Sequence, residues 1–124
     1  MNRKVLITLH GNEVAPRFDL TTEVLIAAVA PDGSVSEDKT LVLPQSSAEK
    51  LCHMVLTEGI GTVICGAMEQ EYFEYLTWKR VNVIDSVVGS YQDVLKRFCE
   101  GKLKTGDLLL DSMLEEQNGD SRLA

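Results

Sequence analysis

The chain opens with hydrophobic runs that predict strands. Lys4–Leu9 is a nearly continuous apolar run, which is typical of a central strand buried on both faces. Two further strands, Glu23–Ala30 and Val35–Leu43, are expected on either side of the turn Pro31-Asp32-Gly33. So short a connection predicts an antiparallel hairpin. Pro44 ends the second strand of this hairpin, because proline cannot donate to a sheet.

The middle of the chain changes to helical spacing. Ser46 followed by Glu49 is a capping box that predicts a helix, which Gly59 ends. The stretches Thr62–Cys65 and Val81–Ile84 predict short buried strands. The first helix is expected to bury Ala48, Leu51, Cys52, Val55 and Leu56. Two more helices are expected to open at Gly66-Ala67-Met68 and at Gly89-Ser90, with Tyr72, Phe73, Leu76, Tyr91, Val94, Leu95 and Phe98 facing inward.

This order of elements predicts an α/β fold with a five-stranded mixed sheet, an antiparallel hairpin at one side and helices on both faces. Ligands of such sheets lie beyond the carboxyl ends of the strands. That rule brings together three segments, His10–Asp19, Gly66–Met68 and Ser86–Ser90. We expect one domain over residues 1–104. Residues 105–124 are an acidic tail in which a short helix over Leu108–Leu114 is expected.

Composition and charge narrow the function. The 124 residues carry a net charge of −7, which disfavours binding to nucleic acid. The longest apolar run, Val24–Ala30, is too short to cross a membrane, and the N-terminal stretch lacks the features of a signal peptide, so a cytoplasmic protein is expected. The three cysteines are widely spaced and form no C-x-x-C pair, which argues against a disulfide framework or a closed zinc site.

Three segments resemble a known family. They are Gly11–Asp19 with the strand Val24-Leu25-Ile26 after it, Val63–Met68, and the closing pattern from Val94 to Leu103. Together they resemble the dinitrogenase iron–molybdenum cofactor biosynthesis family. The resemblance implies a ribonuclease H-like fold, and a nitrogenase accessory-like protein that binds or carries iron–sulfur or molybdenum–sulfur clusters without doing chemistry on them. Many members have His-Phe-Gly where this chain has Arg17-Phe18-Asp19, so a plausible cluster ligand of the family is missing here.

Two side chains are the candidate metal ligands. Cys65 ends a buried strand beside the expected cleft, and a thiolate is a natural ligand for metal–sulfur clusters. The alternative is that Cys65 is a small buried hydrophobe. His10 ends the first strand, where a neutral imidazole suits transition metals. Its alternative is an ordinary hydrogen-bonded loop histidine.

The other candidates line the same loops and would contact the ligand without holding its metal. Arg17 can pair with an anionic cluster or, equally, with Asp19 or Glu13. Phe18 is either a platform for the ligand or a core side chain. Met68 can form, with Val87 and Val88, an apolar wall that shields a cluster from water, or can pack as an ordinary loop residue. The full ligand-binding set is Asn12, Arg17, Phe18, Gly66, Met68 and Gly89.

The leading hypothesis is therefore a non-enzymatic carrier of an iron–sulfur or molybdenum–sulfur cluster, whose partners are the cluster and a protein that donates or accepts it. The alternative is a metal-free regulatory or scaffold module that docks a protein through its apolar and acidic tail. A metal-dependent hydrolase is disfavoured, because the first strand, Lys4–His10, contains no carboxylate.

Overall fold

A mixed sheet built around one buried strand organises the computed structural model, which describes residues 3–109 of the chain. β1 pairs antiparallel with β3 and parallel with β5, and the strand order is β4-β3-β1-β5-β6. The hairpin therefore lies on one side of β1 and the later strands lie on the other, as predicted. The strands are β1 (Arg3–His10), β2 (Glu13–Val14), β3 (Glu23–Val29), β4 (Val35–Val42), β5 (Thr62–Ile64) and β6 (Asn82–Ile84).

The prediction of five strands was wrong by one. β2 forms the sixth strand by pairing antiparallel with the end of β1, where Leu9 lies opposite Val14 and His10 lies opposite Glu13. Two residues carry no periodic pattern, so a strand this short is invisible to an argument from alternation. The hairpin of β3 and β4 is confirmed, with a register shift between Ala28 and Val29.

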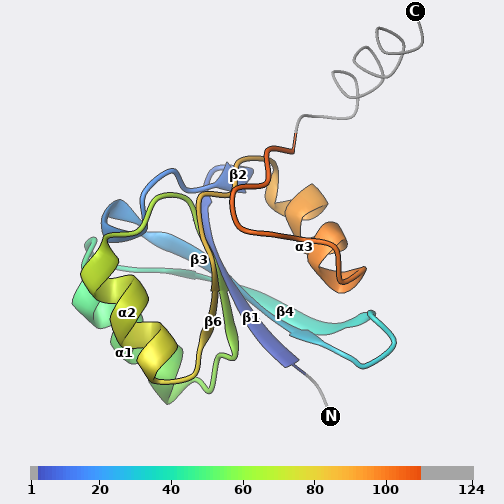
Figure 1. The fold of residues 1–124 in the computed structure, drawn as a ribbon, viewed down its shortest axis with the longest axis horizontal. Coiled ribbons are helices and arrows are strands. Elements are labelled where there is room, and N and C mark those ends of the chain that lie inside the picture. Colours follow the sequence, from blue (N-terminus) through green and yellow to red (C-terminus); the bar gives the residue numbers. More distant parts are fainter. Residues whose placement is uncertain (1–2, 110–124) are drawn as a thin grey trace, which may run out of the picture.

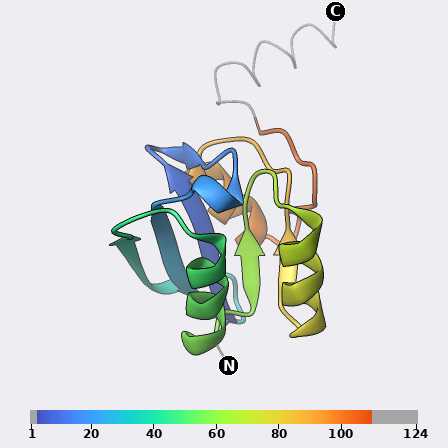
Figure 2. The same ribbon diagram turned by 90° about the vertical axis from the view of Figure 1, so that its left-hand side faces the viewer.

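Helices cover both faces of the sheet, as expected. α1 (Ala48–Thr57) and α2 (Gln70–Trp78) cover one face, and α3 (Tyr91–Cys99) covers the other (Figure 1). Figure 2 shows α1 and α2 in front of the sheet on that shared face. Within residues 3–109, no helix is long and apolar enough to span a membrane.

The two faces are separated by the alternation of β1. Leu6 packs with α1 and α2, whereas Val5 and Ile7 pack with α3. Neighbouring β5 divides in the same way, because Val63 belongs to the first core and Ile64 to the second. Side chains one residue apart on a strand therefore belong to different cores.

The N-terminal caps of α1 and α3 were both predicted from the sequence, and the structure corrects the first and confirms the second. α1 is capped by Ser47 rather than Ser46, because the Ser47 backbone is extended and its hydroxyl accepts a hydrogen bond from the Lys50 N–H at 3.2 Å. At α3 the predicted cap is confirmed, since the Ser90 hydroxyl accepts from the Asp93 N–H at 3.2 Å. α2 begins only at Gln70, three residues beyond Ala67.

After α3 the described chain returns to the loop that follows β6. Leu108 pairs with Val88, and the Leu109 N–H donates to the Val88 carbonyl at 2.7 Å. Leu109 is buried in the core under α3. The rest of the expected helix over Leu108–Leu114 lies outside the described residues, as does most of the acidic tail.

Candidate functional site

A cleft of about 420 Å³ lies beyond the carboxyl ends of β1, β5 and β6. This is the edge of the sheet where the sequence placed a ligand site, and each of the three predicted segments contributes to it. The volume is in the usual range for small-ligand sites, about 300–1,000 Å³. We call it the carboxyl-end cleft, and it is lined by His10, Glu13, Val14, Pro16, Gly66, Ala67, Ser86, Val87, Val88 and Gly89.

Backbone hydrogen bonds hold the loop after β1 against the loop after β5. The Gly66 N–H donates to the Ala15 carbonyl at 3.1 Å, and the Ala67 N–H donates to the Pro16 carbonyl at 2.8 Å. The Phe18 N–H in turn donates to the Ala67 carbonyl at 2.9 Å. Three bonds between segments about fifty residues apart make this wall of the cleft part of the folded framework.

The loop after β6 is held in the same way. The Val14 N–H donates to the Gly89 carbonyl at 2.9 Å, and the Tyr91 N–H donates to the Asn12 carbonyl at 2.9 Å. The Ser86 N–H donates to the Gly66 carbonyl at 2.8 Å, which connects the two later loops to each other. The cleft is therefore preformed by main-chain contacts.

Glycine is required at two points of this framework. A Cβ on Gly66 would lie 2.5 Å from the Ala15 carbonyl oxygen and even closer to that of Pro16. A Cβ on Gly89, whose φ is +150°, would lie 2.8 Å from both the Cβ and the carbonyl oxygen of Leu109. A larger residue at either position would push the loops apart.

The lining is mostly apolar, with two side chains that can bind a metal. His10 and Glu13 are both exposed and lie opposite each other in the β1–β2 pair. Val87 is buried, whereas Val88 is 56 % exposed and forms part of the rim. Neither lysine, arginine nor cysteine lines the cleft in the described part of the chain.

The sequence over residues 1–101 matches the profile of the dinitrogenase iron–molybdenum cofactor family. This chain belongs to that family. The match covers all of the described sheet and helices, and the iron–molybdenum cofactor in its name connects the family to metallocluster chemistry. Among curated proteins, no significant match is found.

Solved structures share the fold. PH0822 is 21 % identical with a TM-score of 0.75, over 82 % of this chain and 93 % of its own. A Methanocaldococcus jannaschii protein provisionally described as a dinitrogenase is 19 % identical with a TM-score of 0.68, over 84 % of this chain and 94 % of its own. The apo form of the orange protein from Desulfovibrio gigas is 16 % identical with a TM-score of 0.68, over 85 % of this chain and 93 % of its own. At these identities the likeness establishes the fold.

Cys65 lies in the core rather than in the lining of the cleft. Its side chain is fully buried with Leu6 and Phe18 on the α1 and α2 side of the sheet. Burial, and to a lesser degree the nearby Asp85 carboxylate, raises the pKa of the Cys65 thiol to about 12. Metal binding requires the thiolate, so the surroundings of Cys65 oppose the form that would bind.

A second buried polar group lies level with Cys65. Thr8 is fully buried, and its hydroxyl has no hydrogen-bond partner within residues 3–109. Since Ile7 pairs with Ile64, the same parallel register places Thr8 beside Cys65 on the neighbouring strand. Both residues therefore lie at the base of the loops that form the cleft.

In the structure Arg17 forms an ion pair with Asp19 and Phe18 is a core side chain, which are the structural alternatives that the sequence left open for them. The Arg17 guanidinium pairs with the Asp19 carboxylate, with Nε 3.0 Å from Oδ1, and neither residue lines the cleft. Phe18 is 1 % exposed and packs in the core, where its ring centroid lies 6.3 Å from that of Tyr72.

Of the remaining residues that were predicted to bind the ligand, two line the cleft and two lie outside its lining. Gly66 and Gly89 line the cleft, as does the predicted metal ligand His10. Asn12 contributes its carbonyl to the framework, and Met68 packs half-buried against the core of α1 and α2. Whether any of these residues binds a ligand stays a prediction.

The sequence did not single out Glu13 as a lining residue. Glu13 faces the cleft because β2 folds back on β1 through Asn12, and the Glu13–Ser90 bridge attaches it to the start of α3. The tight turn Gly11-Asn12 was the available signal, since Gly11 has a φ of +63°. The expected helix N-terminus near Gly66 is absent from the cleft, because α2 starts later.

Proposed function

We propose that this chain binds a metal–sulfur cluster as cargo in the carboxyl-end cleft, and carries it during cofactor assembly or transfer. The observation that supports this most directly is the preformed cleft of about 420 Å³ at the point where the three predicted loop segments, His10–Asp19, Gly66–Met68 and Ser86–Ser90, meet. Membership of the iron–molybdenum cofactor family supplies the class of cargo. The lining residues supply the mode of binding.

The donor set favours a cluster that is already coordinated by its own sulfide. Protein-held iron–sulfur clusters are normally bound by several cysteine thiolates, and the lining includes no cysteine in the described part of the chain. His10 offers one imidazole, and Glu13 offers one carboxylate beside it. We therefore assign His10 as the side chain that faces the metal, and leave Cys65 in a structural role.

The apolar walls suit such a cargo. Val14, Pro16, Val87 and Val88 give the cleft an apolar surface on which sulfide can pack. An apolar shell limits the access of water to a metal centre and influences its potential. Binding by shape, apolar contact and one imidazole would hold the cluster without a covalent framework of thiolates.

We further propose that the role is carriage and not catalysis. A ribonuclease H-like hydrolase would use metal-bound carboxylates on its central strand, and β1 reads Arg-Lys-Val-Leu-Ile-Thr-Leu-His. The carboxyl end of this strand supplies His10 in place of an acid. The residues on these loops can bind and shield a cluster, which is the function that we assign to them.

The test is cluster uptake by protein purified without oxygen. Tetrathiomolybdate, or ferrous iron with sulfide, is offered to the chain, and bound metal and acid-labile sulfide are measured after gel filtration together with the visible spectrum. We expect stoichiometric uptake that weakens at least about tenfold in His10→Ala, the scale on which groups supporting a metal site affect affinity. Val88→Asp, which places a charge on the apolar rim, should also weaken uptake.

His53→Ala is the matched control, because His53 is also exposed but lies on α1, away from the cleft. It should leave uptake unchanged. A wild-type chain that takes up neither molybdenum nor iron would refute the function. Uptake that is the same in His10→Ala and Val88→Asp as in wild type would refute the assignment of the cleft.

A further inference from the structure

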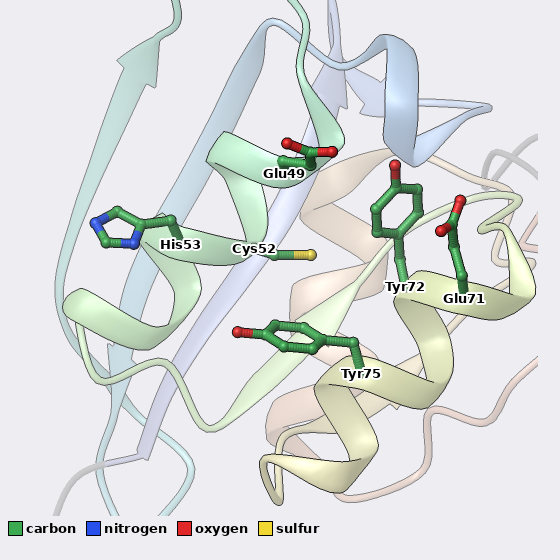
Figure 3. A pocket seen from close by; sticks show the side chains of 6 residues that line it. All are labelled: Glu49, Cys52, His53, Glu71, Tyr72 and Tyr75. Atoms are coloured by element: carbon green, nitrogen blue, oxygen red, sulfur yellow. The ribbon is translucent and has the colours of Figure 1, made fainter.

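A second cavity, of about 430 Å³, opens between α1 and α2, on the face of the sheet opposite α3. Figure 3 shows its side chains, with those of α1 on one side and those of α2 on the other. We call it the α1–α2 groove. It is lined by Glu49, Cys52 and His53 from α1, and by Glu71, Tyr72 and Tyr75 from α2.

The carboxylates of the groove have no cationic partner in the described structure. The ion pairs within residues 3–109 are Arg17–Asp19 and Lys39–Glu58, so Glu49 and Glu71 are in neither. These carboxylates affect the titration of a side chain inside the groove. The pKa of the Tyr72 hydroxyl is raised, mainly by desolvation and to a lesser degree by the negative charges of Glu71, Glu69 and Glu49. The groove therefore presents two carboxylates that no ion pair within residues 3–109 neutralises.

The base of the groove carries a buried thiol that also lacks a partner. Cys52 is 4 % exposed, and in Figure 3 its sulfur points from α1 towards α2, between Tyr72 and Tyr75. No hydrogen bond from or to this thiol occurs among the described residues. A thiol sulfur is a weak acceptor, so an N–H donor entering the groove would find one at its base.

Aromatic rings complete the lining and continue beyond it. Tyr75 and Trp78 are three residues apart on α2, so they lie on one side of the helix. The ammonium group of Lys79 lies 5.8 Å from the Tyr75 ring and 4.8 Å from the Trp78 ring. At the C-terminal end of α2, the Lys79 ammonium group therefore makes cation–π contacts with these two rings. The groove presents aromatic rings to a cation in the same way, together with two carboxylates.

Metal ions fit this site poorly. Although the lining contains acidic, cysteine and histidine side chains, no three such groups within residues 3–109 are placed to hold a metal ion. His53 lines the groove, but in Figure 3 its ring points away from the sulfur of Cys52. A planar or tetrahedral nitrogen cation uses rings and separated carboxylates together, whereas a metal ion needs converging ligands.

We propose that the α1–α2 groove binds a guanidinium or ammonium group, and that this group is an arginine or lysine side chain of a protein partner. The carboxylates of Glu49 and Glu71 neutralise the cation, and the rings of Tyr72 and Tyr75 contact its face. The exposed side chain of Trp78, of which 74 % is accessible, supplies the adjoining apolar contact. Exposed aromatic side chains beside a pocket are typical anchors of protein interfaces.

The first arm of the test uses arginine amide as the probe, titrated into the ¹⁵N-labelled chain. We expect saturable shifts confined to residues 48–57 and 70–78, with a Kd on the order of 1 mM for so small a ligand. Citrulline amide has nearly the same shape without the charge, and should not saturate. The double variant Glu49→Gln/Glu71→Gln should weaken binding at least about fivefold, the upper range for the loss of one exposed ion pair.

Glu37→Gln is the matched control, since Glu37 is an exposed carboxylate on β4 and does not line the groove. It should bind arginine amide as wild type does. The proposal is overturned if arginine amide does not saturate, if citrulline amide binds equally well, or if the shifts lie outside α1 and α2. Cluster uptake should be unchanged in the double glutamine variant, which separates this site from the cleft.

The second arm distinguishes a protein-borne cation from a free one. The probe is the capped peptide acetyl-Leu-Arg-Leu-amide, followed through the same ¹⁵N-detected shifts as arginine amide, because Trp78 is the one tryptophan of the chain and its fluorescence is lost when it is replaced. We expect binding at least about fivefold tighter than that of arginine amide, with the gain lost in Trp78→Ala. A peptide that binds no tighter than arginine amide would overturn the assignment to a protein partner.

Discussion

The three cysteines should differ widely in reactivity, and the difference can be worked out from their surroundings. Burial raises the pKa of the Cys65 thiol from 9.0 to about 12, and that of Cys52 to about 11, in each case with a smaller contribution from a nearby carboxylate. At pH 8 the thiolate fraction of Cys65 therefore falls about a thousandfold relative to an ordinary thiol. A more basic thiolate is also a better nucleophile. On a logarithmic scale, this gain in nucleophilicity offsets nearly half of the loss in reaction rate that the smaller thiolate fraction causes. Cys65 should then react at least about 30 times more slowly and Cys52 at least about 10 times more slowly, because both thiols are buried and limited access slows their reaction further.

The assay is exchange with 4,4′-dithiodipyridine at pH 8, which releases one chromophore for each thiol that reacts. Three phases are expected, with the half-buried Cys99 first, Cys52 second and Cys65 last. The variants Cys99→Ala, Cys52→Ala and Cys65→Ala should each remove one phase, which assigns the order. In denaturant the three phases should merge, because the environments that separate them are lost.

The same measurement tests the structural role that we give to Cys65. Loading the cleft with cluster should leave the slow Cys65 phase in place, and Cys65→Ala should still take up cluster. Reaction of Cys65 at the rate of Cys99 would refute the reasoning from burial. Loss of cluster uptake in a folded Cys65→Ala variant would instead show that the thiol is a ligand.

Three further predictions concern stability, measured by urea unfolding. Gly66→Ala should destabilise the chain by about 2 kcal/mol, because its Cβ meets the carbonyl oxygen of Pro16. Gly61→Ala should change the stability little, because its Cβ lies 3.8 Å from the nearest atom, the Lys4 carbonyl oxygen, and equal effects of the two substitutions would contradict this account. Thr8→Val should stabilise the chain by about 1 kcal/mol, since it removes a buried hydroxyl without a partner, and a loss of stability would imply that the hydroxyl is satisfied. Because the folded pKa of Cys65 lies above its unfolded value, its contribution is intact below pH 9 and is lost as pH rises towards 12. Between pH 8 and 10 this amounts to about 1 kcal/mol, and Cys65→Ala should show a correspondingly shallower fall.

Much of the fold follows from the spacing of apolar residues alone. The nearly continuous apolar run in Lys4–Leu9 predicted the central strand, and the short turn at Pro31-Asp32-Gly33 predicted the hairpin. The structure confirms both. β2 escaped prediction because its two residues are held by their partner strand, and not by a pattern of their own. The start of α1 was misplaced by one residue because Ser46 and Ser47 are both good caps, and only backbone geometry selects between them.

The place of the cleft was predictable, but the side chains that face it were not. Connections of a parallel sheet leave its carboxyl edge together, which is enough to bring the segments at His10, Gly66 and Gly89 into one place. The sequence does not state on which face of the sheet a strand-end residue will lie. Cys65 follows Ile64 by one residue and so belongs to the opposite core, away from the cleft. The sequence therefore predicted correctly that Cys65 precedes a loop of the cleft. The alternation of side chains along the strand turns its thiol into the core on the α1 and α2 side.

The position of Cys65 in the core, and not in the cleft, bears on how the proposed cargo would be released. A cluster held by several thiolates must exchange each of these ligands before it leaves. In the cleft the cargo would meet one imidazole, His10, and walls of apolar side chains, while the buried thiol of Cys65 stays protonated behind them. Such a site gains its affinity from a preformed shape, which the backbone bonds among the three loops maintain. A receiving protein with cysteine thiolates at its own site would then bind the cluster more tightly, because it supplies the thiolate ligands that are absent from the described lining of this cleft.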